Sequence, residues 1–425
     1  MNAINFLKSN FLSIRRGGWR VFFDKAKKVP KRIFLSIVDI FALPFSIPIV
    51  LLIRLLKPFI HIRFGYFYGG RIGHFVPDTV TAVIGDNINN EFVDLYYFLP
   101  GEKNIQWAKM VQSELNIYYW VRFLFFANNI IPGGNIHINL PGLHTPIGSQ
   151  GRFRHGLLYD SDFKFKFNDS DEVIAKSWLI KKGWTDGEKI ICVMVRDNAY
   201  LPFKNWGYHN YRNCEISAFI PALELLASMG YWVIRMGKIM ETPLKLNNNR
   251  IIDYPFDKEK SDLLDVWLFA NCELCITTGT GPDLISCLYK RPVLAINYLP
   301  LAAMFSWAEA TSAPKNLLWK ESGRSLTWEE HLEHSYVHSS QYEDAGISVV
   351  DLNSEEILDI TKEVISRLNK TFVDNDDSKV QDKFWQIAKQ SKHLNKYNNF
   401  IHPDSRIALS YVRNNLEWLS LQNKV

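Results

Sequence analysis

The sequence predicts a mixed α/β protein with a parallel, doubly wound sheet, and three observations support this fold class. Strand-like apolar runs alternate with helix-like segments from residue 170 onward, as in consecutive βαβ units. Distinctive polar clusters follow the predicted strand ends, which is where such sheets bind ligands. The 425 residues are 47% hydrophobic and 22% charged, so the chain can bury a large core and should form at least two domains. This composition excludes a disordered chain and a disulfide scaffold.

The second half of the chain contains the clearest elements. Ser170 is placed to cap the first helix of this region, and Gly230 is placed to end a later one. A Gly-rich turn at 278–282 joins a strand to the helix that follows. The expected elements are a helix at 170–182, a strand at 189–195, a helix at 216–229, strands at 231–235 and 273–277, a helix at 283–289, a strand at 292–296, and two polar helices between 379 and 421.

The first half is predicted to be a less regular mixture of helices and strands. Short apolar or alternating runs occur at 81–84, 92–99 and 135–139, and a helix-like segment lies at 117–126. Residues 140–170 are rich in Gly, Pro, Ser and Asp, as is typical of a connection between domains. The expected organisation is an N-terminal segment at 1–62, a first lobe at 63–150, a linker at 151–170, a second lobe at 171–370 and C-terminal helices at 371–425 that pack back on the lobes.

The positive charge of the chain is concentrated at its N-terminal end. The formal net charge is +5, but residues 1–71 contain 13 Lys and Arg against 2 Asp and Glu. The remaining residues contain 36 basic side chains against 42 acidic ones. A basic end on a slightly acidic body indicates a separate partner for that end, either an anionic membrane surface or a nucleic acid.

An apolar stretch at 33–56 favours the membrane over the nucleic acid. It is long enough to cross a bilayer, but Asp39, Pro44 and Pro48 interrupt it. Because basic residues lie on both sides, a re-entrant hairpin kinked at the prolines would keep both basic clusters on the cytoplasmic face. Residues 6–23 mix aromatic, aliphatic and arginine side chains, as expected of an interfacial helix. The alternative is that the stretch is a core helix of a soluble domain.

Three polar clusters at strand ends form the predicted ligand site. Backbone N–H groups and hydroxyls of the Gly-rich turn could hold a diphosphate, with positive charge supplied by the neighbouring strand ends. The turn matches neither a dinucleotide fingerprint nor a P-loop. The clusters comprise Arg196 and Asp197 after the strand at 189–195, Arg235, Gly237 and Lys238 at the end of the strand at 231–235, and Thr278, Gly279, Thr280 and Gly281 after the strand at 273–277.

Two further groups of residues are candidates for the same site. Tyr211, Arg212 and Asn213 lie in a polar loop that begins with His209, where Asn213 could cap the next helix and the others could face a ligand. His74 follows a glycine and could act as a general base, although a lone histidine is more often structural.

The cysteines and the paired aspartates do not predict a metal site. Five cysteines lie between residues 192 and 287, an odd number that favours a reducing compartment over a disulfide framework. Cys272 and Cys275 have no second pair at zinc-site spacing. Asp-x-Asp triplets at 160–162, 169–171 and 374–376 do not follow a predicted apolar strand. We therefore expect no bound metal.

Several of these motifs together resemble a bacterial glycosyltransferase family. The resemblance covers most of the chain from about residue 33 to the tail, although the family's turn is closer to Ser-Ser-Gly than to the Thr-Gly-Thr-Gly-Pro found here. The motifs are VMVRDNAYL at 193–201, HNYRN at 209–213, GYWVIRMG at 230–237, SDLLDV at 261–266, the turn at 278–282, and RFG with RIGH between 63 and 74.

The resemblance implies a GT-B-like enzyme with two Rossmann-like lobes and a membrane-associated helical segment at its N-terminus. It also implies a nucleotide-sugar as co-substrate, no metal and no other cofactor. The acceptor would be a glycan, which could be lipid-linked, and the pathway bacterial surface polysaccharide synthesis. The protein would associate peripherally or re-entrantly with the cytoplasmic face of the inner membrane, and its partners would include an anionic membrane surface and no nucleic acid.

In this scheme the first lobe binds the acceptor and the second binds the donor. Arg196, Arg235, Lys238 and residues 278–281 would hold the donor diphosphate and stabilise the charge that develops on it. Tyr211, Arg212 and Asn213 would order the donor or close the cleft. The candidate bases are His74, Asp86 and Asp197. Two other functions remain open: a nucleotide-sugar epimerase or hydrolase on the same scaffold, and a non-catalytic, membrane-bound, sugar-binding protein.

Overall fold

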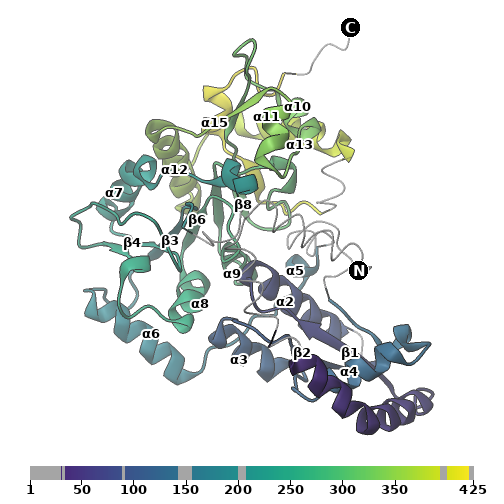
Figure 1. The fold of residues 1–425 in the computed structure, drawn as a ribbon. Coiled ribbons are helices and arrows are strands. Elements are labelled where there is room, and N and C mark those ends of the chain that lie inside the picture. The colour runs from purple at the N-terminus through teal and green to yellow at the C-terminus, as the bar shows by residue number, and fades with distance from the viewer. Residues whose placement is uncertain are drawn as a thin grey trace.

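A seven-stranded parallel sheet forms the centre of the second part of the chain (Figure 1). The computed structural model describes residues 30, 34–88, 91–141, 156–199, 207–392 and 400–420. Helices cover both faces of the sheet, and a smaller α/β region with a long apolar helix extends from it toward the lower right of Figure 1. The predicted mixed α/β class is confirmed.

All strands of the large sheet run parallel, in the order β11-β8-β7-β6-β3-β4-β5. The four strands predicted from the sequence are present, each shortened by a residue at one or both ends. Their side chains are almost all buried, because helices cover both faces of the sheet. The strands are β3 (Ile190–Met194), β4 (Trp232–Arg235), β5 (Ile251–Asp253), β6 (Leu274–Thr277), β7 (Val293–Ile296), β8 (Ala310–Ala313) and β11 (Ser405–Ile407).

The chain reverses its direction of travel across the sheet between β3 and β6. From β3 it moves outward to β4 and β5, and it then returns to the other side of β3 to continue through β6, β7 and β8. In doubly wound sheets, ligands bind beyond the carboxyl ends of the two strands that flank such a reversal. The ends of β3 and β6 therefore mark the place where a site is expected.

Two groups of helices enclose the sheet (Figure 1). In one group α8 packs against α6 and α9, and in the other α12 packs against α7. Asn168 caps α6 by accepting the Asp171 N–H at 2.8 Å, so the predicted Ser170 cap is wrong by two residues. The helices are α5 (Leu157–Asp160), α6 (Asp169–Lys181), α7 (Ile220–Ser228), α8 (Asp262–Asn271), α9 (Asp283–Leu288), α10 (Trp328–Glu333), α11 (Ser339–Asp344), α12 (Ser354–Leu368), α13 (Asp377–Gln390) and α15 (Leu409–Asn414).

A small antiparallel pair, β9 (Asn316–Trp319) with β10 (Ile347–Val350), lies outside the large sheet. It forms a separate hydrophobic cluster with Tyr211, Leu299 and Tyr342. The pair brings residues from the later part of the chain toward the loops that follow β3.

The smaller region is a single βαβ unit with added helices. Its strands β1 (His61–Phe67) and β2 (Phe92–Phe98) pair in parallel, and α2 (Ile72–Ile88) connects them. The run at 81–84, expected from its short apolar pattern to be extended, lies inside α2, so that expectation is wrong. The helix expected at 117–126 begins four residues later. The added helices are α3 (Ile105–Glu114) and α4 (Val121–Ile130).

The described part of the predicted linker is packed against the large core. Leu158 and Phe165 are buried in that core, and the Phe165 carbonyl accepts a hydrogen bond from the Tyr289 hydroxyl at 2.8 Å. Residues 151–155 of the predicted linker lie outside the described residues. The Phe165 ring also contacts the Trp107 ring of α3, with centroids 4.9 Å apart, so this segment packs against both regions instead of forming a free connection.

The apolar stretch forms one uninterrupted helix, Phe34–Leu55. Its length and apolar composition would allow it to cross a membrane, but core helices of soluble proteins and signal sequences also have these two properties. The chain stays helical through Pro44 and Pro48, so the proline-kinked hairpin is not the structure of this segment. The basic residues 1–29 that precede it lie outside the described residues.

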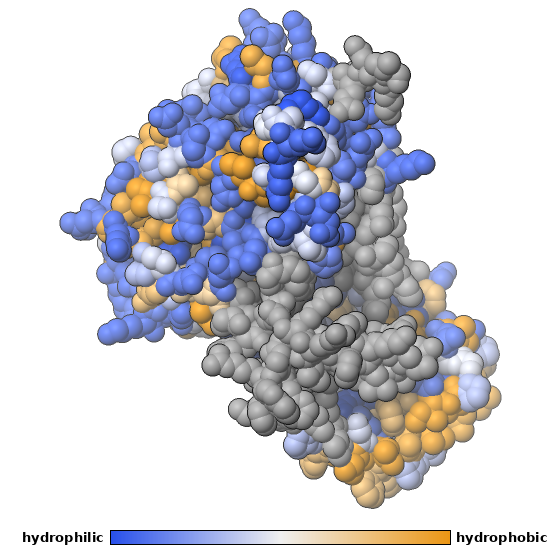
Figure 2. All heavy atoms as spheres, turned by 45° about the horizontal axis from the view of Figure 1, so that its top comes forward, coloured by the Kyte–Doolittle hydropathy of each residue, from blue (hydrophilic) through white to orange (hydrophobic). Residues whose placement is uncertain are grey.

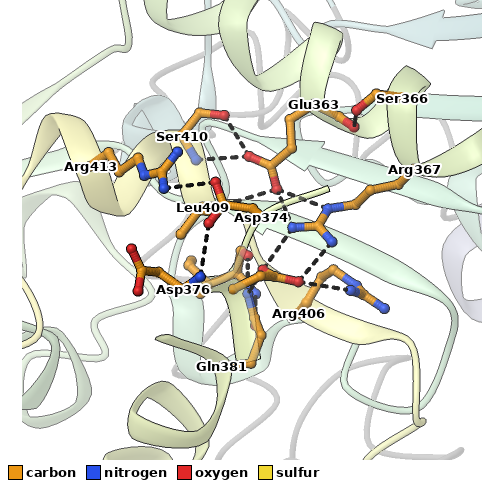
Figure 3. Close-up of polar contacts among 12 residues, drawn as sticks. Glu363, Ser366, Arg367, Asp374, Asp376, Gln381, Arg406, Leu409, Ser410 and Arg413 are labelled. Carbon is orange, nitrogen blue, oxygen red and sulfur yellow. Dashed lines mark hydrogen bonds and ion pairs between the residues drawn. The ribbon is translucent and has the colours of Figure 1, made fainter. Parts of the chain in front are cut away.

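The C-terminal helices are held to α12 by a charged network (Figure 3). The buried Glu363 carboxylate accepts the Leu409 and Ser410 N–H groups at the start of α15, at 3.1 and 2.7 Å. Arg367 bridges Glu363 at 2.9 Å to Asp377 at 2.7 Å. Through this network the C-terminal helices pack on α12.

The two regions meet where α2 packs on α9 and α3 packs on α8, and one of these contacts joins two glycine backbones. A Cβ added at Gly73, at the start of α2, would lie 2.7 Å from the Gly281 Cα, and a Cβ at Gly281 would lie 2.7 Å from the Gly73 Cα. Backbone atoms cannot rotate away as a flexible side chain can, so both positions exclude any side chain. The start of α2 is thereby fixed against the turn that follows β6.

We expect Gly73→Ala to destabilise the protein, by about 1–3 kcal/mol, because the added methyl group overlaps the Gly281 backbone. Gly85→Ala is the matched control, since it lies in the same helix with nothing within 4 Å of its added Cβ. Its alanine should be neutral or stabilising by up to about 1 kcal/mol. Thermal unfolding midpoints measure both, and a Gly73→Ala protein at least as stable as Gly85→Ala would contradict the contact.

Candidate functional site

The ends of β3 and β6 are joined by a hydrogen bond across the reversal point. The Arg196 N–H, two residues past β3, donates to the Thr278 hydroxyl oxygen at 3.0 Å. Thr278 in turn donates its own N–H to the Met194 carbonyl at 3.1 Å. These bonds fix the Arg196 backbone beside the Gly-rich turn, so the first and third polar clusters of the sequence come together as predicted.

The Gly-rich turn binds an acidic group of its own. The Asp283 carboxylate is buried and accepts the Thr280 N–H at 2.7 Å and the Thr277 hydroxyl at 3.0 Å. The Thr277 hydroxyl oxygen accepts the Gly279 N–H at 3.1 Å. In this respect the structure differs from the sequence-based prediction, because these backbone donors are satisfied within the turn instead of facing a diphosphate.

Burial raises the pKa of Asp283 to about 7. Hydrogen bonds from Thr277 and Thr280 and the positive charge of Arg212 act in the opposite direction, but burial dominates. One carboxylate oxygen, Oδ1, has no hydrogen-bond partner among the described residues. Asp283 is therefore neutral in part of the molecules at pH 7, and its charge varies within the physiological range.

Arg212 lies against the turn from the side of the β3 loops. Its guanidinium donates to the Gly279 carbonyl, and a Cβ added at Gly279 would lie 3.6 Å from the Arg212 Nη2 atom. Gly279 has φ of +79° and faces the Tyr298 ring, so no other residue fits there without strain. Within the described ranges no carboxylate lies at ion-pair distance from Arg212, and its Nε is buried without an acceptor.

Arg196 is connected to Lys315 through Asn213. The Arg196 Nε donates to the Asn213 side-chain oxygen at 3.0 Å, and the Lys315 ammonium donates to the Asn213 carbonyl at 2.6 Å. Lys315 is buried and forms an ion pair with Asp351 at 2.6 Å. Asn213 thus holds two cationic side chains in place, and it does not cap a helix as the sequence had suggested, because the next helical turn starts at Ile216 after Glu215.

His209 lies half-buried beside these positive charges. The pKa of His209 is lowered to about 4, first by burial and then by the positive charges of Arg212 and Arg196. Its ring stacks on that of His338 with centroids 6.1 Å apart. His209 is consequently uncharged at neutral pH. We refer to Arg196, Arg212 and Lys315, beside which His209 lies, as the cationic cluster.

Tyr211 has a packing role beside the cationic cluster. The side chain is buried against Tyr342, and its N–H donates to the Ser339 hydroxyl oxygen at 3.1 Å. These contacts tie the short helix η3 (Gly207–Arg212) to α11 and so position Arg212.

The cluster at the end of β4 has a different role from the one predicted. Arg235 is 1% exposed, forms an ion pair with Asp253 at 3.2 Å and donates to the Thr242 carbonyl at 2.7 Å. Gly237 is packed against Met240. Lys238 is exposed. Loss of Arg235 would leave Asp253 unpaired and would therefore report on stability rather than on ligand binding.

The candidate bases Asp197 and His74 have different surroundings. Both Asp197 oxygens accept backbone N–H groups, from Ala199 at 3.0 Å and Glu241 at 2.7 Å, so Asp197 fastens the loop after β4 to the loop after β3. His74 is half-buried in the first turn of α2, next to the glycine that contacts the turn. The side chain of Asp86 lies outside the described residues.

Two residues of the site lay outside the sequence-based prediction. Asp283 directly follows the Gly-rich turn, and an acidic residue one position after such a turn was an available signal. Lys315 comes from the loop between β8 and β9, and nothing in the local sequence connects it to Asn213. Both are brought in by the sheet topology.

The described residues contain no group of three or more metal-ligating side chains. All five cysteines are free and buried. At least one aspartate of each triplet forms an ion pair: Asp162 with Lys290, Asp171 with Lys109, and Asp374 with Arg413.

Known structures of glycosyltransferases and of a UDP-GlcNAc 2-epimerase resemble this chain only distantly. No family model matches the chain, and no curated protein matches it. A glycosyl transferase family 9 structure from Veillonella parvula is 12% identical, with a TM-score of 0.39 over 60% of this chain and 86% of that one. The E. coli ADP-heptose LPS heptosyltransferase II is 12% identical, with a TM-score of 0.38 over 59% of this chain and 90% of that one.

A UDP-GlcNAc 2-epimerase from Neisseria meningitidis, in complex with UDP-GlcNAc, is 11% identical, with a TM-score of 0.30 over 80% of this chain and 96% of that one. At such identities and TM-scores these similarities do not decide the activity of this chain. The assignment of function therefore rests on its own residues.

Proposed function

We propose that the protein is a glycosyltransferase that uses a nucleotide-sugar donor whose diphosphate binds to the cationic cluster. The observation that carries this proposal is the pair Arg196 and Arg212 at the reversal point of the parallel sheet, where Arg212 has no carboxylate partner among the described residues. Guanidinium groups bind phosphate oxygens in two-pronged geometry. After burial, the charges of Arg212 and Arg196 also lower the pKa of the neighbouring His209, in keeping with positive charge at the same place.

In the proposed reaction the acceptor hydroxyl attacks the anomeric carbon of the donor sugar, and the bond from that carbon to the nucleoside diphosphate breaks. Negative charge then accumulates on the leaving diphosphate, and the two arginines stabilise it. His74 is the proposed base, because it lies in the first turn of α2, which the contact between Gly73 and Gly281 fixes beside the turn. We include a lipid-linked glycan acceptor and a role in surface polysaccharide synthesis in the proposal, in line with the sequence resemblance.

The donor site can be tested by thermal unfolding of the full chain with UDP-, GDP-, dTDP- and CMP-sugars. A ligand at 100 times its Kd stabilises the folded protein by about 2.7 kcal/mol. We expect at least one diphosphate donor to raise the unfolding midpoint. A response to none of the four, or to the monophosphate CMP-sugar alone, would contradict a diphosphate site.

Arg212→Ala should weaken binding of the responding donor by roughly 10- to 100-fold, because one charge-assisted contact is lost. Arg250→Ala is the control: Arg250 precedes β5 at the amino ends of the strands, away from the site, and donates to the Gly230 carbonyl at 2.9 Å, much as Arg212 does to Gly279. Arg250 also pairs with Glu188 at 2.8 Å, so its alanine variant loses a charged contact without touching the site. Unfolding without ligand checks that both variants fold, and Arg212→Lys tests whether charge alone suffices. Equal donor affinity in the two alanine variants would exclude Arg212 from the site.

We expect donor affinity to fall as the pH rises through about 7, because Asp283 then acquires a negative charge near Arg212. The stability effect has the same sign. A carboxyl group whose pKa is raised on folding contributes stability below its unfolded pKa of about 4 and loses that contribution as the pH rises through the folded value. Asp283→Asn should flatten both dependences between pH 5 and pH 8, values that bracket the shift to about 7. Titration with the responding nucleotide-sugar across this pH range measures the donor affinity, and thermal unfolding measures the stability. An unchanged pH dependence in Asp283→Asn would show that Asp283 is not the group that titrates.

A further inference from the structure

Polar contacts hold one face of the helix Phe34–Leu55 to the protein, and the opposite face is large and apolar. Its inner stripe, at three- and four-residue spacing, comprises Asp39, Leu43, Ser46, Val50 and Arg54 and packs on the small region. Its outer face exposes large apolar side chains, among them Phe41 and Phe45 at 76% each. Figure 2 shows hydrophobic residues gathered at the lower right, in the part of the molecule where Figure 1 has this helix.

Charged contacts fix both ends of this helix to the folded body. Near its start, Asp39 pairs with Arg122 at 2.6 Å, with both side chains buried, and Arg122 also donates to the Leu35 carbonyl at 3.0 Å. Near its end, Arg54 donates to the Asn128 side chain at 2.8 Å and to the Pro132 carbonyl at 2.7 Å. A helix held near both ends by α4 and the residues after it cannot stand across a bilayer without breaking these contacts, and a buried ion pair is costly to separate.

The exposed apolar surface continues beyond the helix at both ends. Tyr118, Tyr119 and Trp120 are about half exposed and directly precede α4, within one turn of Arg122 and thus beside the start of the helix. Ile130 and Ile136 are exposed near the Arg54 end. Aromatic side chains with a polar edge are typical of the membrane–water interface. We refer to the outer face of Phe34–Leu55 with these five residues as the apolar face.

The charge around the apolar face identifies its occupant. Between Asp24 and Asp78 the only acidic residue is Asp39, and that carboxylate is paired inward with Arg122. The sequence just before the helix contains Lys25, Lys27, Lys28, Lys31 and Arg32. An exposed apolar helix that is preceded in the sequence by cations and whose own carboxylate is turned inward is complementary to anionic phospholipids. Pro44 and Pro48 have no N–H group, so the carbonyls of Ile40 and Pro44 receive no helical hydrogen bond. Both residues lie on the exposed side, where interfacial water can hydrate these carbonyls.

We propose that the apolar face docks on an anionic lipid bilayer with the helix Phe34–Leu55 lying in the plane of the interface rather than crossing it. This docking is independent of the proposed transferase activity. It leaves both ends of the helix on one side of the membrane and keeps the smaller region against the lipid surface.

The test is flotation of the full chain with vesicles of phosphatidylcholine, with and without an anionic phospholipid. The wild type should float with the anionic vesicles, and added salt should weaken this binding, since it screens the charges. The double variant Phe41→Gln with Phe45→Gln should have a vesicle–water partition coefficient that is lower by about tenfold or more, because two large apolar side chains are lost from the interface. Glutamine keeps the helix propensity.

The matched control is Val173→Gln with Ile180→Gln, which removes two exposed apolar side chains from α6 and should float like the wild type. Failure of the wild type to float, or equal flotation of both double variants, would overturn the proposal. Light scattering without lipid gives a further outcome. A wild-type dimer that becomes a monomer in the variant Phe41→Gln with Phe45→Gln would also overturn the proposal, because a second copy would then cover the apolar face.

The in-plane orientation has its own readout. Single cysteines introduced at Ser36 and at Lys57 should both react with a membrane-impermeant maleimide added outside vesicles to which the protein has bound. The five native cysteines are buried, and the unmodified chain measures their background. Protection of one introduced cysteine until the vesicles are lysed would show that the helix crosses the bilayer and would overturn the in-plane orientation.

Discussion

The close approach of Gly73 and Gly281 is the constraint on which the site depends. Two backbones meet without intervening side chains, one at the start of α2 and one in the turn after β6. Arg212 holds the same turn through the Gly279 carbonyl. The turn therefore fixes His74 from the smaller region and Arg212 from the larger one relative to each other, although the two are far apart in sequence. A site between two regions needs such a rigid reference point.

The electrostatics of the site follow from where the acidic and basic groups are buried. Asp283 satisfies the backbone donors of the turn, so a phosphate would have to be bound by side chains rather than by those N–H groups. Arg196, Arg212 and Lys315 gather on the β3 side. Burial, together with the charges of Arg212 and Arg196, lowers the pKa of His209 and keeps it uncharged. Because Asp283 titrates near neutrality, the net charge of the site is adjustable within a narrow pH range.

The smaller region combines two surfaces with opposite requirements. Its inner surface, through Gly73, needs tight packing against the larger region, whereas its outer surface exposes the long apolar helix. The Asp39–Arg122 pair and the bonds of Arg54 turn the polar atoms of that helix inward and leave its apolar atoms outward. In the proposed arrangement a membrane-bound acceptor and a donor bound at the sheet would reach the site from different sides of the same small unit.

The sequence by itself determined the fold class, the four central strands to within one residue at each end, and the meeting of Arg196 with the turn at 278–281. These follow from local patterns, since buried parallel strands are apolar runs and their carboxyl ends share one edge of the sheet. Tertiary structure decided the partners. It paired Arg235 with Asp253, brought Lys315 to Asn213, buried Asp283 in the turn and kept Phe34–Leu55 helical through two prolines. Ion pairing and burial depend on which distant segments pack together, and no local pattern encodes that.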